Sequence, residues 1–271
     1  MTEQGQLSPQ LGEIIVVKIG GAILGTRDST VEDIVELHRR SFWPVVIHGG
    51  GLLISEWLTR HNVPTRFERG LRVTDEESLR VVVAVLAGLV NKQIVAAIQA
   101  AGEPAVGLSG ADGGMFHCRL AGENLGFVGD IVSVDPGPLA RVLLAGVIPV
   151  LAPIGVLWED DRPTAQLLNI NADTAAGVIA SVLGARWLAF LTDVPGVKSA
   201  SGEVIPHLTA EEAAGLIADE TIQGGMIPKV EACLTAAETG TQSVVLGTDQ
   251  PGALLTVVAG KPAGTIVGGG T

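Results

Sequence analysis

Two lysines and one aspartate, drawn from distant parts of the chain, are residue types that could act together on a phosphoryl group. Lys18 lies near the end of an apolar run, and Asp173 and Lys229 each lie in the first turn of an expected helix. A lysine at the start of a helix is unfavourable against the helix dipole, and a bound anion nearby would offset that cost. Compact ammonium charges and an acid that orients them suit phosphoryl transfer.

Glycine-rich turns follow two of the apolar runs. The first is Gly20-Gly21, directly after Ile14-Ile-Val-Val-Lys-Ile, and the second is Gly49-Gly-Gly51, which an expected helix follows at once. Free N–H groups at such turns bind phosphate or carboxylate. The first turn is not a Walker A loop, because Thr26 stands where lysine is required. Each turn alone could equally be structural, and His48 is either a general base or a side chain bonded to the backbone.

Several polar residues at strand–helix junctions extend this pattern. Arg72 could hold a carboxylate with two parallel hydrogen bonds or be an ordinary solvated arginine. Asn169 and Asp173 stand four residues apart, and Asn171 between them could simply cap the helix. The segment Leu191–Lys198, with its Pro-Gly turn, suits a nucleotide base and ribose but also a plain turn. Taken together, these residues describe a phosphoryl-transfer site without a Walker motif.

The composition limits the class of protein. The chain has 271 residues, enough for one large α/β domain or two modest lobes, and 47% of them are hydrophobic. The net charge is −12 and the 17 Lys and Arg residues are scattered, which argues against a general nucleic-acid binder. Cys118 and Cys233 have no metal-ligand spacing and are expected to be reduced thiols.

No signal peptide or membrane span is expected. Residues 1–12 are polar and lack the charged and apolar regions of a secretory signal. The apolar run Val81–Val90 is too short to cross a bilayer, and Leu143–Trp158 is interrupted by Pro149 and Pro153. These features predict a soluble cytoplasmic protein.

Short β-branched runs alternate with Ala- and Leu-rich segments along the chain. This alternation predicts an α/β fold whose central parallel sheet is buried on both faces. A glycine-rich stretch, Met115–Val134, predicts a β excursion from that sheet. The expected strands are Ile14–Ile19, Pro44–Ile47, Ala105–Leu108, Val147–Leu151, Trp187–Leu191 and Ser243–Leu246. The expected helices are Ser29–Arg40, Leu52–His61, Glu76–Ala101, Pro138–Ala145, Ala172–Leu183, Ala210–Ala218, Lys229–Thr239 and Pro251–Ala259.

The expected helix Glu76–Ala101 differs from the others. Thr74 is its expected N-cap, and residues 81–90 are apolar on every face. A helix that is apolar all round is buried all round. It therefore lies either in a subunit interface or wholly inside one subunit.

In their order along the chain, these motifs resemble the amino-acid kinase family and, within it, the N-acetylglutamate kinases. The match covers almost the whole chain. It consists of Lys18-Ile-Gly-Gly21, His48-Gly-Gly-Gly51, Gly70-Leu-Arg-Val-Thr74, Asn91-Lys92, Asn169-Ile-Asn-Ala-Asp173, Thr192-Asp-Val-Pro-Gly196 and Gly224-Gly-Met-Ile-Pro-Lys229.

The resemblance implies a three-layer α/β/α sandwich with a mainly parallel central sheet. It implies an acyl-amino-acid-binding and dimerisation lobe over residues 1–183 and an ATP-binding lobe over residues 184–271. The implied reaction transfers phosphate from ATP, with Mg²⁺, to the side-chain carboxylate of N-acetyl-L-glutamate, the second step of arginine biosynthesis. No protein ligand for the metal is expected.

The resemblance also assigns roles to single residues. Lys18 and Lys229 would stabilise the transferring phosphoryl group, and Asp173 would position them. The residues that would hold the acetylglutamate are Gly50, Gly51, Arg72 and Asn169. The residues that would line the nucleotide site are Gly20, Gly21, Asp193, Val194, Pro195, Gly196, Val197, Lys198, Thr221, Ile222 and Gln223.

Two alternative functions stay open, and one departure from the family is noted. A related kinase could act on aminoadipate or glutamate linked to a carrier protein, or the chain could be a sensor of nucleotide or amino acid without catalysis. Only about a dozen residues precede the first expected strand, whereas hexameric, arginine-inhibited members carry a long helix there. We therefore expect a homodimer, built on the helix after Thr74, without arginine feedback.

Overall fold

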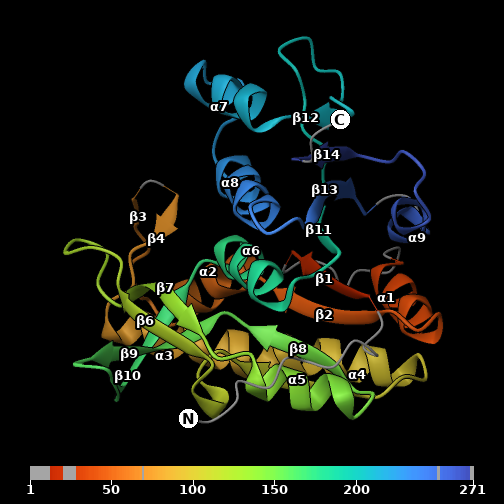
Figure 1. Cartoon of the computed structure of the whole chain (residues 1–271). Helices are drawn as coiled ribbons and strands as arrows, with labels where there is room; N and C mark the ends of the chain where they lie inside the picture. Colours follow the sequence, from red (N-terminus) through yellow and green to blue (C-terminus); the bar gives the residue numbers. More distant parts are fainter. Residues whose placement is uncertain (1–12, 21–28, 69, 249–250, 269–271) are drawn as a thin grey trace.

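A mainly parallel, eight-stranded sheet forms the centre of the computed structural model, which describes residues 13–20, 29–68, 70–248 and 251–268. Among its neighbouring strands, only β13 and β14 pair antiparallel. Figure 1 shows the sheet extending from β8 to β12 and β14. In spatial order the strands are β12 His207–Leu208, β14 Thr265–Val267, β13 Gln242–Gly247, β11 Trp187–Thr192, β1 Ile14–Ile19, β2 Trp43–His48, β8 Ile148–Ala152 and β5 Ala105–Ser109.

The strand β1 shows why its sequence is apolar throughout. All six of its residues are buried. Ile15 and Val17 belong to a core on one face of the sheet, whereas Val16 belongs to the core on the other face. Successive side chains of a strand point to opposite faces, so a strand covered on both sides needs apolar residues at nearly every position.

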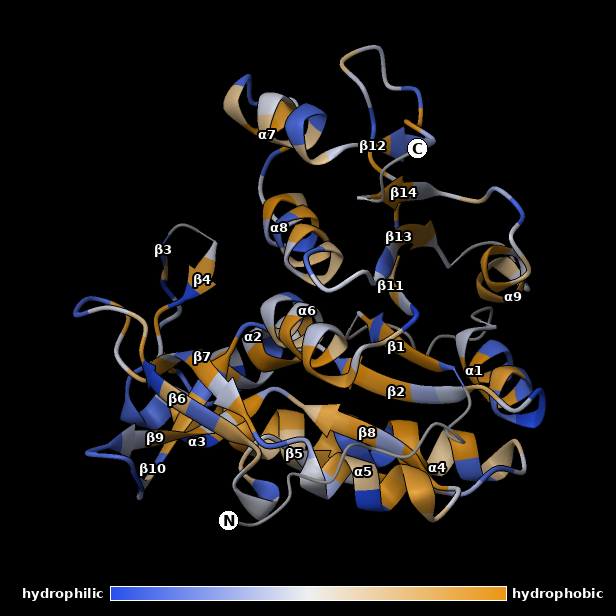
Figure 2. Ribbon diagram, viewed as in Figure 1, coloured by the Kyte–Doolittle hydropathy of each residue, from blue (hydrophilic) through white to orange (hydrophobic). Residues whose placement is uncertain are grey.

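Helices cover both faces of the sheet, which confirms the predicted three-layer α/β/α sandwich (Figures 1 and 2). One core is shared with α5 Gly137–Leu144, α6 Ala172–Leu183, α7 Ala210–Ala218 and α8 Met226–Ala237. The other is shared with α1 Thr30–Arg39, α2 Gly51–Arg60, α9 Ala253–Val258 and a long helix over residues 76–100. Helix α8 begins three residues earlier than expected, because Pro228 is tolerated in the first turn of a helix.

A small closed barrel lies beside the main sheet and confirms the β excursion predicted for Met115–Val134. It is formed by β6 Phe116–Leu120, β7 Val128–Val134, β9 Ile154–Glu159 and β10 Arg162–Ile170. The strands expected from the sequence include neither β9 nor β10. The two-residue strands β3 Phe67–Glu68 and β4 Leu71–Arg72 form a separate hairpin, and a short turn of helix, η2, covers Asp112–Gly114.

The long helix consists of α3 Glu76–Val83, a π-helical stretch η1 Ala84–Val90 and α4 Asn91–Ala100. Its N-cap is Asp75, whose side chain accepts a hydrogen bond from the Ser78 N–H, so the expectation that Thr74 caps it was wrong. Asp75 is the better acceptor because its carboxylate is charged and lies at the positive end of the helix. The Thr74 hydroxyl instead donates to the Arg72 carbonyl oxygen.

This long helix is buried on one side only. Val82, Val85 and Leu86 are buried, whereas Ala84 and Gly88 are exposed. The alternative prediction, that the whole helix is buried inside one subunit, is therefore wrong. By length and composition alone the helix could also cross a membrane, with a mean hydropathy of 2.1, but its buried side belongs to the core of the sandwich.

Candidate active site

Asp173 holds a lysine on each of its two carboxylate oxygens. The Lys18 Nζ lies 2.6 Å from Asp173 Oδ1, and the Lys229 Nζ lies 3.0 Å from Oδ2. Lys18 comes from β1, Asp173 from the first turn of α6 and Lys229 from α8. The structure thus brings together three predicted catalytic residues that are as far as 211 positions apart in the chain, from 18 to 229.

Local sequence explains the position of Asp173. The side chain of Asn171 accepts hydrogen bonds from the N–H groups of Asp173 and Thr174, at 2.8 and 3.0 Å. Asn171 is therefore the N-cap of α6, which confirms the cap that its sequence position suggested. The carboxylate of Asp173 lies at the positive end of the helix dipole, which favours its charged form.

The net charge of this cluster favours the binding of an anion. Burial lowers the pKa of Lys18, the negative charge of Asp173 opposes that change, and the nearby positive charge of Lys229 adds to it. Two ammonium groups share one carboxylate, so the charged cluster carries a net positive charge. A phosphate group would supply the missing negative charge.

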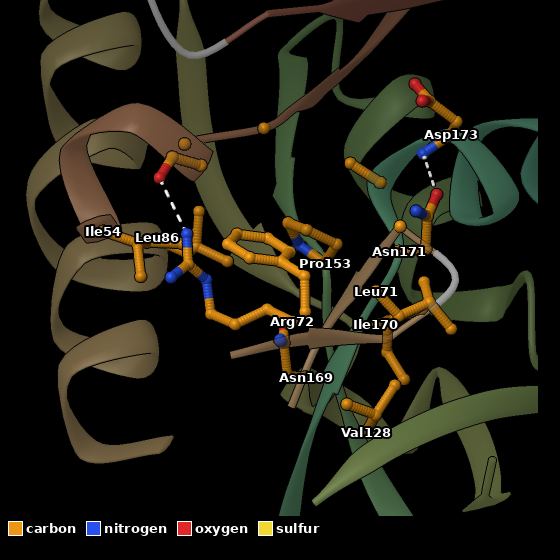
Figure 3. A pocket seen from close by; sticks show the side chains of 16 residues that line it. Ile54, Leu71, Arg72, Leu86, Val128, Pro153, Asn169, Ile170, Asn171 and Asp173 are labelled. Carbon is orange, nitrogen blue, oxygen red and sulfur yellow. Dashed lines mark hydrogen bonds between the residues drawn. The ribbon is translucent and has the colours of Figure 1, made fainter. Parts of the chain in front are cut away.

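A pocket of about 260 Å³ begins at Asp173 and is lined by predicted substrate residues (Figure 3). Its walls include the three glycines that follow β2 and the hairpin β3–β4. This volume suits a small molecule rather than a macromolecule. The predicted residues in the lining are Gly50, Gly51, Arg72, Asn169 and Asp173.

Arg72, which lines this pocket, carries a buried nitrogen without a hydrogen-bond partner. Its Nη2 donates to the Gly51 carbonyl oxygen at 3.0 Å and to Ser55 Oγ at 2.7 Å, and Figure 3 shows the first of these bonds. Its Nη1 is buried and has no protein partner in the described part of the chain. The guanidinium carbon lies 4.7 Å from the centre of the Phe67 ring. Because buried donors normally find an acceptor, Nη1 marks the place where a carboxylate ligand would fit.

Asn169 lies beside Arg72 in the pocket (Figure 3) and is fixed by the segment before the long helix. Its Nδ2 donates to Thr74 Oγ1 at 3.1 Å. Thr74 in turn is completely buried. The amide of Asn169 is thus held in one orientation, at the end of β10 and close to the Asn171 cap.

The predicted nucleotide residues are not brought into this pocket, and two of them have buried side chains. Val197 and Ile222 belong to the hydrophobic core, so only their backbone atoms could face a ligand. Asp193 and Lys198 are exposed. Gly20 directly follows β1, and Gly21 lies outside the part of the chain that the structure describes. The remaining predicted positions in this group, which line no part of the pocket, are Val194, Pro195, Gly196, Thr221 and Gln223.

Sequence reasoning missed the apolar part of the pocket. Ile54, Leu86, Val128 and Pro153 line it, as does Phe67. Apolar residues of this kind are as common in a protein core as in a pocket, so their types carried no signal. Phe67, three residues before Gly70, was the one cue available.

A sequence model of the amino acid kinase family matches residues 13–247 of the chain. The chain belongs to the amino acid kinase family. Among curated members of this amino acid kinase family, a protein named acetylglutamate kinase from Dehalococcoides mccartyi is 39% identical over 266 residues, which cover 97% of each chain. Another of that name, from Methylobacterium nodulans, is 43% identical and covers 94% of this chain and 88% of its own.

Solved structures agree with this assignment to the amino acid kinase family. A crystal structure from Streptococcus mutans has a TM-score of 0.81 and 29% identity, and it covers 94% of this chain and 98% of its own. N-acetylglutamate synthase from Neisseria gonorrhoeae, complexed with coenzyme A and N-acetyl-glutamate, also has a TM-score of 0.81, with 25% identity and 61% of its own chain covered. A carbamate kinase from Giardia lamblia, at 16% identity and a TM-score of 0.67, shares the fold.

Proposed function

We propose that this member of the amino acid kinase family is an acetylglutamate kinase. It transfers the terminal phosphoryl group of ATP to the side-chain carboxylate of N-acetyl-L-glutamate and releases ADP and N-acetyl-L-glutamyl 5-phosphate. Its relatives of 39 and 43% identity carry this name over nearly their whole length. The observation that carries the proposal is the pair of lysines on Asp173, beside a pocket with an unsatisfied arginine nitrogen.

The chemistry requires no general base. The acceptor is a carboxylate, which is already a nucleophile at neutral pH. The protein therefore has to hold two anions in line and to stabilise the charge on the group in transfer. In our proposal Lys18 and Lys229 supply that charge, and Asp173 keeps their ammonium groups apart and correctly aimed.

The acidic substrate is held by the pocket residues. In our proposal Arg72 Nη1 receives a carboxylate of N-acetylglutamate, which would satisfy its missing hydrogen bond. Asn169 and the N–H groups of Gly50 and Gly51 bind the remaining polar atoms. The apolar lining, including Leu86 and Pro153, suits an acetyl group and the carbon chain.

We propose that ATP binds as its Mg²⁺ complex over residues 184–271. The described residues contain no group of three or more His, Cys, Asp or Glu side chains that could hold a metal ion. Asp173, the acid nearest the site, already has both oxygens on lysines. In our proposal the metal arrives as part of the substrate, on the phosphate oxygens. Asp193 to Lys198 and Thr221 to Gln223 are the proposed contacts with the nucleotide.

We further propose a cytoplasmic homodimer that works in arginine biosynthesis. The open side of the long helix, with Ala84 and Gly88, offers an apolar surface to a second copy. Sedimentation at micromolar concentration tests this assembly, and a monomer or a hexamer would contradict it. Activity in millimolar arginine tests the expected absence of feedback, and strong inhibition would contradict it.

A coupled ADP-release assay with a panel of acidic amino acids tests the function directly. N-acetylglutamate should be phosphorylated far faster than glutamate, aspartate or N-acetyl-aminoadipate. Lys229→Ala should abolish the activity, whereas Lys261→Ala, at an exposed lysine outside the site, should leave it unchanged. ADP release that requires an aminoadipate carried on a protein would favour the carrier-linked kinase. No ADP release with any acylated acidic amino acid would favour a sensor.

A further inference from the structure

A buried histidine and asparagine lie directly behind the glycine turn of the pocket. His48 is the last residue of β2 and Asn91 is the first of α4, and both side chains are completely buried. Asn91 Nδ2 lies 3.2 Å from His48 Nε2 and 2.9 Å from the Val150 carbonyl oxygen of β8. Neither residue has a part in the phosphoryl transfer described above.

The hydrogen bonds determine where the imidazole carries its proton. His48 Nδ1 lies 3.0 Å from the Gly49 carbonyl oxygen, which can only accept, so Nδ1 must be the protonated nitrogen. Nε2 then accepts from Asn91. Burial lowers the pKa of His48 to about 4, with smaller effects from Lys92 and Lys18 in the same direction and the Gly49 bond opposing them. The neutral ring with one donor and one acceptor agrees with that pKa.

Asn91 fits a space that the neighbouring strand leaves for it. A β-carbon on Gly107 of β5 would stand 1.8 Å from Asn91 Oδ1, so only glycine is compatible with this position of the amide. Lys92 Nζ donates to the same oxygen at 2.9 Å. With β5 and β8 both in contact, Asn91 cannot turn, and the imidazole it contacts is held as well.

The fixed imidazole in turn orients the backbone of the glycine turn. The N–H of Gly49 donates to the Ile19 carbonyl oxygen of β1 at 3.0 Å, and its carbonyl is held by His48. In a trans peptide the carbonyl and the following N–H point in opposite directions. The Gly50 N–H is therefore turned away from the imidazole, and within the described part of the chain it has no backbone acceptor.

We infer that His48 and Asn91 are positioning residues, which hold the Gly49–Gly50 peptide so that the Gly50 N–H faces an oxyanion of the bound acidic substrate. This inference rests on the proposed function for the identity of that anion. The alternative role of His48 as a general base disagrees with the geometry. Both ring nitrogens have partners inside the fold, and the ring has no exposed surface.

Two substitutions separate the two bonds of the imidazole. The amide nitrogen of His48→Asn lies at the position of Nδ1 and can still donate to the Gly49 carbonyl. The amide of His48→Gln lies at the position of Nε2 and leaves that carbonyl without its donor. Both remove the ring, so their difference reports the bond to Gly49. His61→Gln, at an exposed histidine, is the control.

Steady-state kinetics with N-acetylglutamate give the first readout. His48→Gln and Asn91→Ala should raise the KM for N-acetylglutamate about tenfold, the effect of weakening one hydrogen bond to a charged group, and should change the KM for ATP less than about twofold. His48→Asn should have a KM for N-acetylglutamate close to that of the wild-type protein. An equal KM for the Asn and Gln variants would overturn the inference. Absence of ADP release from the wild-type protein would instead reject the proposed function.

Crystal structures of the two variants without substrate give a readout that does not depend on activity. The Gly49–Gly50 peptide should keep its orientation in His48→Asn and turn in His48→Gln. An unchanged peptide in His48→Gln would overturn the inference, whatever substrate the protein uses.

Discussion

Gly177 of α6 lies so close to Ala232 of α8 that a β-carbon at position 177 would stand 2.8 Å from the Ala232 carbonyl oxygen. Gly177 is one helical turn beyond Asp173, and Ala232 is nearly one turn beyond Lys229. This tight contact between the two helices therefore lies next to the ion pair that they carry. The small residues of α6 and α8 determine how far apart Asp173 and Lys229 can be.

The first prediction concerns this helix crossing. Alanine in place of glycine inside a helix is normally favourable by about 0.5–1 kcal/mol. Gly177→Ala should instead destabilise the fold by about 1–3 kcal/mol, because the added methyl overlaps backbone atoms of α8. It should also lower kcat about tenfold, because Lys229 is displaced from Asp173. Urea unfolding and steady-state kinetics measure the two effects.

Gly215→Ala is the matched control for that experiment. Gly215 lies in α7, and a β-carbon there would meet no other atom within 4 Å. This variant should be as stable as the wild-type protein or more so, with unchanged kcat. If both variants behaved alike, the close approach of α6 and α8 would have no functional meaning.

The second prediction concerns the guanidinium of Arg72. Lysine keeps the positive charge but cannot form the fork of parallel hydrogen bonds, so it cannot both hold Ser55 and Gly51 and receive a carboxylate. Arg72→Lys should raise the KM for N-acetylglutamate about 10- to 100-fold and leave the KM for ATP nearly unchanged. Arg141→Lys, at an exposed arginine of α5, is the control. A normal KM in Arg72→Lys would exclude a forked contact.

The third prediction follows from the pKa of Lys18. Burial lowers this pKa below the ordinary value of 10.5. Since the charged ammonium is the active form, kcat/KM should decline as the pH rises through a value below 10.5. Asp173 raises the pKa of Lys18, so Asp173→Asn should move that decline to lower pH. Asp161→Asn, at an exposed aspartate between β9 and β10, should leave the profile unchanged. A shift in the opposite direction would contradict the pairing of Lys18 with Asp173.

The fourth prediction concerns stability in acid. The pKa of His48 is about 4 in the folded protein and about 6.5 in an unfolded chain. In the window between these values the unfolded state binds the additional proton, so stability is lost as the pH falls. Between pH 7 and pH 5 this residue should account for a loss of about 2 kcal/mol. Urea unfolding at pH 7 and at pH 5 measures this loss. Between the two pH values, the free energy of unfolding of the wild-type protein should fall by about 2 kcal/mol more than that of His48→Asn. Equal losses would contradict the buried, neutral imidazole.

Much of the fold could be predicted from the sequence, because the apolar runs and caps that specify its strands and helices lie within short segments. A strand such as β1, buried on both faces, requires apolar residues at almost every position, and such runs are easily recognised. Helix α6 was predicted at its observed bounds, since Asn171 caps it and Gly184 ends it in the left-handed conformation. The strands β9 and β10 were missed because Pro153 and Pro163 interrupt or border them, and proline normally argues against a strand.

The charged residues of the site could be predicted from the sequence, whereas the contacts between distant residues could not. Lys18 and Lys229 stand out by type, since each is a charge in an otherwise unfavourable place. The cap of the long helix was assigned to Thr74 because threonine and aspartate both serve as caps, and the neighbour Asp75 has the stronger acceptor. The role of His48 depends on a contact with Asn91, 43 positions away, which no local pattern contains.

The central claim is that Lys18 and Lys229 converge on the phosphoryl group in transfer. A crystal structure of the protein with ADP, N-acetylglutamate and aluminium fluoride, which mimics that group, tests it most directly. We predict that both Nζ atoms lie within about 3 Å of fluorine atoms, with Asp173 still between the two side chains. A complex in which either ammonium group points away from the fluoride would contradict the account.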